Sequence, residues 1–210
     1  MENFGCSQVT SDMRELFGAG KAHAEMVRLI FNHEAASLVD TRASEVAVDV
    51  GGASGTFIHA LMAVNPTLRG AVFDLPAALP VAAKAGYELG LQDRFSVVAG
   101  DFFNDALPPA DLYLLKAILR DWNDNGCLTI LRNCRLALNP GGRIVVAEVL
   151  TGEAERPGFA PLMDPTTMVV PGGKERNLKE FQALFDAAGF RLTAVKPTST
   201  PFVLVEALAR

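Results

Sequence analysis

Short apolar runs and helix-like segments alternate along the chain from residue 45 onward, and this alternation constrains the fold more than any other feature. Each run is rich in Val, Ile, Leu or Phe, whereas segments such as GTFIHALMAV (55–64) continue at helical spacing. Buried strands joined by helices form a parallel sheet with helices on both faces. We therefore predict an α/β fold with a doubly wound, mostly parallel sheet. Its strands would be EVAVDV (45–50), GAVFD (70–74), FSVVAG (95–100), DLYLL (111–115) and RIVVAEVL (143–150).

Proline and polar residues mark where the helices between these strands begin and end. Pro76 is placed for the first turn of a helix that reaches about Gly90. Asn123 or Asp124 can cap a helix that runs through CLTILRNCRLAL, and NPGG (139–142) should then stop this helix. These signals agree with the strand positions.

The C-terminal part predicts one more helix and a hairpin. Asn177 with Glu180 resembles a capping box, and Gly189 is a good helix terminator, so NLKEFQALFDAA is predicted to be helical. FRLTAVKP (190–197) and FVLVEAL (202–208) are typical of strands, and TSTP separates them. We expect a hairpin at the sheet edge with an antiparallel last strand.

The segments outside this alternation have other patterns. Residues 11–40 are predicted to be helical, and Gly18 and Gly20 would divide them into two helices. TGEAERPGFAP (151–161) is polar and contains Gly and Pro, which predicts a mobile surface loop. The apolar positions of the N-terminal helices are Met26, Leu29, Ile30, Phe31, Leu38 and Val39.

Charge and hydropathy exclude several classes of partner. The chain has 210 residues, of which 19 are Lys or Arg and 24 are Asp or Glu, and the net charge is -5. No basic run could follow a phosphate backbone, so nucleic acid is not an expected partner. No apolar run approaches the ~20 residues that cross a bilayer, and we expect a cytoplasmic protein without membrane contact. Cys6, Cys127 and Cys134 lack metal-ligand spacing and are predicted core thiols of a reducing compartment.

Glycines gather where the first strand turns into the first helix. In VDVGGASG, Gly51, Gly52 and Gly55 permit a tight turn and a close approach to a ligand. A dinucleotide fingerprint would need further glycines where this chain has Ala53 and Thr56, so a nicotinamide cofactor is disfavoured. The turn predicts a nucleotide-type ligand of another kind.

Two acids follow the next strands. Asp74 comes nineteen residues after Gly55, where a carboxylate can accept hydrogen bonds from both hydroxyls of a ribose. Asp101 lies in GDFF at the end of the third strand, beside the aromatic side chains of Phe102 and Phe103, which could pack on an adenine.

Eight blocks together resemble one family. VDVGGASG, FDLPAAL, GDFF, DLYLLKAILRDW, ILRNC, NPGGRIVVAEV, LMDPTTMVV and GGKERNLKEF occur in this order. They resemble the plant and bacterial small-molecule O-methyltransferases, which act on phenols, flavonoids, hydroxyindoles and polyketides. The resemblance implies a class I methyltransferase fold, which is Rossmann-like with seven strands, and S-adenosylmethionine as the cofactor. The cofactor-binding residues that it implies are Gly51, Gly52, Asp74, Asp101, Phe102, Lys116 and Trp122.

The block LKAILRDW departs from the family pattern at its most important position. Relatives read LKH-x-L-HDW, in which the His before Asp-Trp is the general base, a role worth about 10²- to 10⁴-fold in rate. Arg120 occupies that position here, and a guanidinium cannot accept a proton at neutral pH. Two flanking acids of the family site remain, Glu148 and Glu175, so the implied catalytic residues are Arg120, Glu148 and Glu175.

Three interpretations of Arg120 remain open. Arg120 could form a closed ion pair with Glu148 or Glu175, which would make the chain a noncatalytic cofactor-binding protein or a partner subunit. It could instead lower the pKa of a bound phenol, or pair with a substrate carboxylate, so that electrostatics replace the base. It could also point to solvent while another group acts, and a further possibility is a reaction other than methylation, such as hydroxylation.

Other candidates for substrate contact and catalysis are fewer. Met163 and Met168 lie in the block that lines the acceptor pocket of the family, and thioethers suit a flat aromatic acceptor. His59 is expected to be exposed on its helix, and His23 and His33 to be solvated or capping, so none is assigned as the base.

The domain organisation follows from the extent of the resemblance. Residues 45–210 correspond to the catalytic domain and residues 1–44 to linking helices, without the N-terminal dimerisation domain that is usual in the family. The chain is either a natural short form or a fragment. We expect an open apolar surface there, and therefore a homodimer or association with a full-length relative. The predicted activity is methyl transfer to a small hydroxylated aromatic substrate.

Overall fold

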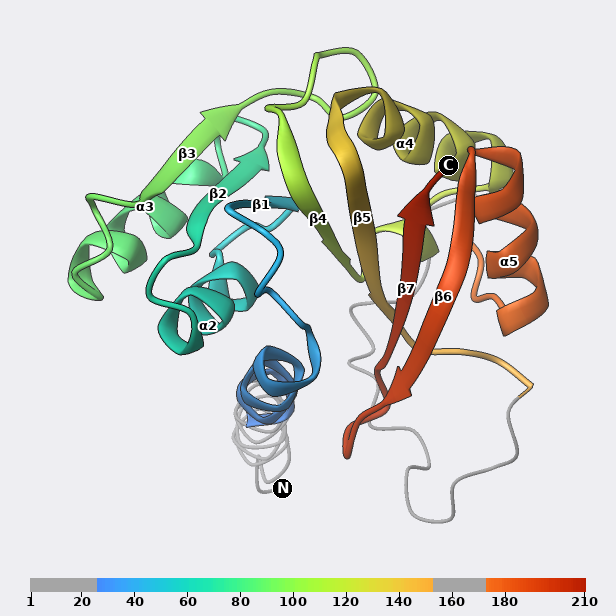
Figure 1. Ribbon diagram of the computed structural model, residues 1–210, viewed down its shortest axis with the longest axis horizontal. Coiled ribbons are helices and arrows are strands. Elements are labelled where there is room, and N and C mark those ends of the chain that lie inside the picture. Colours follow the sequence, from blue (N-terminus) through green and yellow to red (C-terminus); the bar gives the residue numbers. More distant parts are fainter. Residues whose placement is uncertain (1–25, 153–172) are drawn as a thin grey trace, which may run out of the picture.

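A computed structural model of the chain describes residues 26–152 and 173–210 and contains one seven-stranded sheet (Figure 1). The strand order is β3-β2-β1-β4-β5-β7-β6. β7 runs antiparallel to both β5 and β6, and the remaining pairs are parallel, which confirms the predicted mostly parallel sheet with an antiparallel last strand. The strands are β1 (Val46–Val50), β2 (Arg69–Asp74), β3 (Phe95–Ala99), β4 (Ala110–Lys116), β5 (Leu138–Glu148), β6 (Phe190–Pro197) and β7 (Val203–Ala209).

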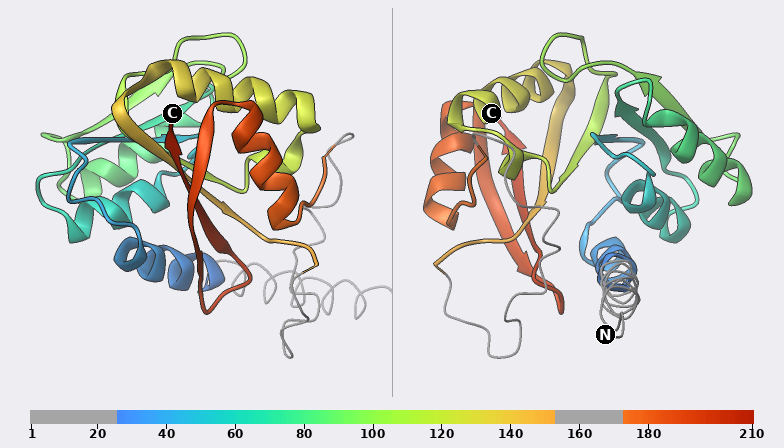
Figure 2. Two further views of the ribbon diagram at one scale, coloured as in Figure 1. Left: turned by 45° about the vertical axis from the view of Figure 1, so that its right-hand side comes forward. Right: turned by 180° about the vertical axis from the view of Figure 1, so that it is seen from behind.

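Helices cover both faces of the sheet (Figures 1 and 2). One apolar core joins α2 (Thr56–Val64), α3 (Leu79–Glu88) and a helix described over residues 26–38 to side chains such as Val72 and Leu114. The other core joins α4 (Asp124–Ala137) and α5 (Leu178–Ala187) to side chains that alternate with these along the strands. Because both faces are buried, the strands are continuous apolar runs rather than alternating ones.

The capping signals and the buried thiols were predicted correctly. The Asn123 side chain accepts a hydrogen bond from the Gly126 N–H at the start of α4, and Asn177 and Glu180 form the complete capping box of α5. Cys127 and Cys134 are free and buried, whereas Cys6 lies outside the described residues. These local signals position α4 and α5 against the sheet.

Two predicted boundaries were wrong. Pro76 lies in a turn after β2, and α3 begins at Leu79, with Pro80 taking the helix-start position. The chain first turns at the end of β2, where the Ala78 N–H donates to the Leu75 carbonyl. NPGG (139–142) belongs to β5 rather than to a separate stop, because α4 already ends at Ala137 and the extra residues are absorbed by a shift in the β4–β5 register.

His59 was predicted to be exposed, and it is buried instead, with 5% of its surface accessible. Its ring lies 4.4 Å from that of Phe95 of β3, centroid to centroid. It fills the space left by Gly55, where an added Cβ would be 2.9 Å from His59 Cε1. Burial lowers the pKa of His59 and keeps the imidazole neutral.

The helix described over residues 26–38 divides its apolar residues between two faces. Phe31 and Ala35 are buried in the core that the helix shares with α2. Met26, Leu29 and Ile30 are exposed, at 59%, 59% and 46%. Over the described ranges, no helix is long and apolar enough to cross a membrane.

Candidate active site

The glycine turn after β1 is held in a conformation that restricts side chains. Gly51 has φ 67° and its N–H donates to the Phe73 carbonyl at 2.8 Å. Ala53 also has a positive φ, 47°, so this residue adopts the left-handed region that favours glycine. A Cβ added at Gly52 would lie 2.6 Å from the Asp49 Cγ, so this position is closed to side chains. The turn therefore exposes backbone rather than side chains.

Asp74 lies at the end of β2, next to this turn. Its Oδ2 accepts the Ala53 N–H at 2.9 Å, and its Oδ1 accepts the Leu75 N–H at 2.7 Å. Because each carboxylate oxygen has two lone pairs, the half-buried group can accept further hydrogen bonds from a ligand. The two backbone donors fix its orientation.

Asp49 is a buried acid at the site that sequence reasoning missed. It is 2% exposed, and burial raises its pKa to about 7, while the Lys116 charge and the Ile58 N–H act in the opposite direction. The sequence did contain a signal for Asp49, because it is an acid inside the apolar run of β1. Burying a charged group costs free energy, so an acid at such a position indicates a specific role. It packs beneath Gly52 and so supports the turn.

The GDFF loop places its aromatic side chains near the turn. The Asp101 carboxylate of this loop forms hydrogen bonds within the loop itself. The Asp101 carboxylate accepts the Phe103 N–H at 2.9 Å and the Asn104 side-chain amide at 2.7 Å. A Cβ added at Gly51 would lie 3.6 Å from the Phe102 ring, and the Phe102 and Trp122 rings are 6.1 Å apart. The structure thus brings Phe102 and Trp122 together beside the glycine turn.

Lys116, at the end of β4, extends toward the helix over residues 26–38. Its Nζ donates to Asn32 Oδ1 at 3.2 Å and lies 4.9 Å from the Phe31 ring centroid and 5.8 Å from that of Phe202. These contacts place its ammonium between that helix and the β6–β7 hairpin.

Arg120 belongs to a short 3-10 turn, η1 (Leu119–Asp121), that follows β4. Its side chain is 13% exposed, and its Nη2 lies 3.9 Å from Glu175 Oε1. Its backbone N–H, rather than its guanidinium, donates to Glu148 Oε1 at 3.2 Å. A side chain so little exposed does not point to solvent.

Glu148 is enclosed at the end of β5, with 1% of its surface accessible. Burial raises its pKa to about 7, although the backbone N–H and the positive charge of Arg120 both oppose this rise. Close to neutral pH, the carboxyl is therefore present in both protonation states. Its contact with Arg120 orients the backbone of η1.

Arg176 was not predicted as a site residue. Its side chain links the segment that contains Glu175 to η1 through hydrogen bonds. The guanidinium is fully buried and donates to the carbonyls of Leu119 at 2.9 Å and Trp122 at 2.8 Å, and twice to Asp124 Oδ1. In the same region the Lys174 N–H donates to the Arg120 carbonyl at 2.8 Å. No periodic pattern in the sequence predicts this set of hydrogen bonds.

Met163 and Met168, the predicted acceptor contacts, lie outside the described residues.

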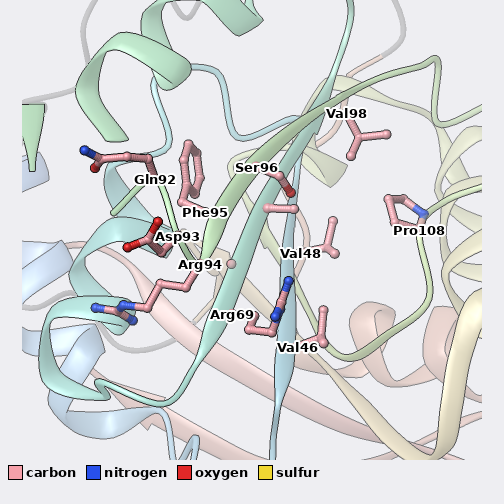
Figure 3. A pocket seen from close by; sticks show the side chains of 12 residues that line it. Val46, Val48, Arg69, Gln92, Asp93, Arg94, Phe95, Ser96, Val98 and Pro108 are labelled. Atoms are coloured by element: carbon pink, nitrogen blue, oxygen red, sulfur yellow. The ribbon is translucent and has the colours of Figure 1, made fainter. Parts of the chain in front are cut away.

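A separate pocket of about 380 Å³ lies against β1, β2 and β3 (Figure 3). Arg69, Gln92 and Asp93 line it at the beginnings of β2 and β3, whereas Asp74 stands at the end of β2. The pocket is therefore distinct from the candidate site.

Comparisons with known proteins show which family this chain resembles. The chain matches the family model of the O-methyltransferase domain over residues 2–191. Phenazine O-methyltransferase PhzM of Lysobacter antibioticus is 35% identical over 83% of this chain and 51% of that protein. The mitomycin 7-O-methyltransferase MmcR superposes with a TM-score of 0.80 at 32% identity, over 95% of this chain and 58% of that one.

One of the similar solved structures contains two bound small molecules. NcsB1, an O-methyltransferase from neocarzinostatin biosynthesis, was determined with S-adenosylmethionine and 2-hydroxy-5-methyl naphthoic acid. It superposes with a TM-score of 0.77 at 33% identity, over 97% of this chain and 60% of that one.

The strand order and the glycine turn are those of a Rossmann-like methyltransferase fold. The chain belongs to the O-methyltransferase family, and S-adenosylmethionine is the cofactor of this family. It spans about half the length of the curated relatives that it matches.

Proposed function

We propose that this chain binds S-adenosylmethionine at the ends of β1 and β2 and transfers its methyl group to a hydroxyl of a small aromatic acceptor. The observation that carries the proposal is the pairing of the glycine turn with the Asp74 carboxylate, which the Ala53 N–H orients at 2.9 Å. When bound, the cofactor supplies an electrophilic methyl group on a sulfonium. Family membership supports the same reaction.

The residues of the site fit this cofactor. The Asp74 carboxylate keeps acceptor capacity for the ribose hydroxyls, and the closed position at Gly52 leaves backbone facing the ligand. Phe102 and Trp122 offer aromatic surface for the adenine. Asp101 and Lys116 would contribute at the edges of the same ligand.

We favour an electrostatic role for Arg120 over a closed ion pair. A direct charge-assisted hydrogen bond measures about 2.7–2.9 Å, whereas the Arg120 guanidinium is 3.9 Å from Glu175. Glu148 takes the Arg120 backbone N–H instead of the guanidinium. Among the contacts of residues 26–152 and 173–210, the guanidinium donors therefore remain for an acceptor. Met163 and Met168 are proposed acceptor contacts through their thioethers.

A second candidate function is that of a noncatalytic partner subunit that binds the cofactor. The observation in its favour is the exposed apolar group Met26, Leu29 and Ile30 on the helix over residues 26–38, which could meet another copy or a full-length relative. The two candidates differ in whether any methyl group is transferred.

The purified chain is expected to convert S-adenosylmethionine to S-adenosylhomocysteine only when a phenolic acceptor is present. The measurement is mass spectrometry of the thioether product and of the methylated phenol after incubation with a panel of simple phenols. Equal amounts of the two products would support the transferase. Cofactor binding without product from any phenol would favour the partner-subunit function.

A further inference from the structure

The group at the base position cannot take the proton of the acceptor. Arg120 remains a cation at any working pH, and its side chain is turned inward with 13% of its surface exposed. A phenol of ordinary acidity, with a pKa of about 10, is almost fully protonated at neutral pH. Methyl transfer to such a phenol would leave a proton that Arg120 cannot accept.

The carboxyl closest to the Arg120 backbone is badly placed for this task. Glu148 is 1% exposed and its Oε1 already accepts the Arg120 N–H, so an acceptor in the open part of the site does not reach it. Glu175 is more exposed, at 44%, and is the ionic neighbour of the Arg120 guanidinium. Glu148 is thus held by the Arg120 backbone, whereas Glu175 is a partly solvated carboxylate at a long distance from the guanidinium.

Neither histidine of the described ranges is placed to take the proton. His59 packs on Phe95 beneath the glycine turn, and its Nε2 is buried without a hydrogen-bond partner. His33 is exposed on the helix over residues 26–38. Neither imidazole is linked to η1 by a contact in the described part of the chain.

The charge of Arg120 favours one kind of acceptor. A guanidinium stabilises an anionic oxygen through charge-assisted hydrogen bonds, and this effect is stronger where the guanidinium is little exposed to water, as the 13% exposed Arg120 side chain is. Glu175 leaves the donors available, because its ion pair is long and its own side chain is 44% exposed.

We propose that the acceptors of this site are acidic phenols, which bind beside Arg120 as phenolates already ionised in solution. The phenolate oxygen forms the new O–CH3 bond while the S–CH3 bond breaks, and the electron pair of that bond stays on sulfur. The proton was lost to water before binding, so no protein group needs to accept it. This inference rests on the proposed methyl transfer and adds the class of acceptor.

The test uses phenols of similar size whose own pKa values run from about 7 to about 10. kcat/KM is measured for each over about pH 6 to 9, with S-adenosylmethionine saturating. At pH 7 the ionised fraction differs by roughly 500-fold across this series, while the less basic phenolates are weaker nucleophiles. We expect the most acidic phenol to react about 10-fold or more faster at pH 7. Its pH midpoint should lie near its own pKa, whereas kcat/KM of the phenol with a pKa of about 10 should still be rising at about pH 9.

A matched pair of variants isolates the charge. Arg120→Gln is expected to raise KM for the most acidic phenol about 10-fold, because a charge-assisted contact is lost, and to leave the affinity for S-adenosylmethionine unchanged. Arg132→Gln, at an exposed position of α4, should change neither.

The outcomes separate the two levels of the proposal. Equal rates along the series, with one fixed pH midpoint, would mean that a protein group such as the exposed Glu175 takes the proton, and this would overturn the acceptor class while methyl transfer stands. No product from any phenol would overturn the methyl transfer itself and the acceptor class with it.

Discussion

Arg120→His is expected to raise methyl transfer to phenols of ordinary acidity by about 10²-fold or more. An imidazole at this position accepts a proton at neutral pH, which the guanidinium does not. Two carboxyls would flank it, since the backbone of residue 120 donates to Glu148 and its side chain lies near Glu175. The measurement is the initial rate with a phenol of pKa about 10, at pH 7.

Arg120→Gln is the matched control, because glutamine removes the charge without supplying a base. This variant should show no gain with the same phenol. A histidine variant that binds S-adenosylmethionine but stays as slow as the glutamine variant would contradict the assignment of position 120 to the reaction centre.

Arg176→Met is expected to lower the free energy of unfolding by about 3 kcal/mol. Methionine fills part of the volume but leaves the carbonyls of Leu119, Trp122 and Lys174 without their buried donor. The ion pair itself contributes less, because the Asp124 side chain is 59% exposed and would be hydrated in the variant. Unfolding in urea, followed by circular dichroism, measures the change.

Arg132→Met provides the control for loss of an arginine. Arg132 is exposed on α4 and makes one long hydrogen bond, 3.5 Å to the Ala187 carbonyl, so a change within about 0.5 kcal/mol is expected. If the two variants were equally stable, the buried network around Arg176 would not be holding η1 and the segment at 174–176 together.

The sheet could be predicted because its strands are buried on both faces. Each strand is then a short apolar run between helices, and that pattern is local enough to be read from the sequence. Asn123 and the Asn177 capping box were predicted correctly for the same reason, since a cap depends on residues three positions apart.

The errors arise where tertiary contacts decide. His59 of α2 is buried because Gly55 leaves room for its ring and because Phe95 of β3 packs against it. The helical periodicity of the sequence predicts neither contact. NPGG (139–142) is part of β5 because the pairing between β4 and β5 shifts its register there and accommodates the extra residues. In both cases the deciding partner is distant in sequence or lies in another element.

The site was predicted in part. Asp74, Phe102 and Trp122 gather around the glycine turn because parallel strands end at one edge of the sheet. The roles given to them, and to Glu148, Glu175 and Lys116, stay predictions. Arg176 could not be found from the sequence, because its partners on η1 and α4 lie more than fifty residues away.

Calorimetric titration of the chain with S-adenosylmethionine, repeated with Asp74→Ala, tests the central claim most directly. The account predicts saturable one-site binding that weakens roughly 10- to 100-fold in Asp74→Ala, because a carboxylate that accepts two ribose hydroxyls is lost. Asp93→Ala, at an exposed position two residues before β3, is the matched control and should bind like the unchanged chain. Equal binding by Asp74→Ala, or no binding by the unchanged chain, would contradict a cofactor site at the ends of β1 and β2.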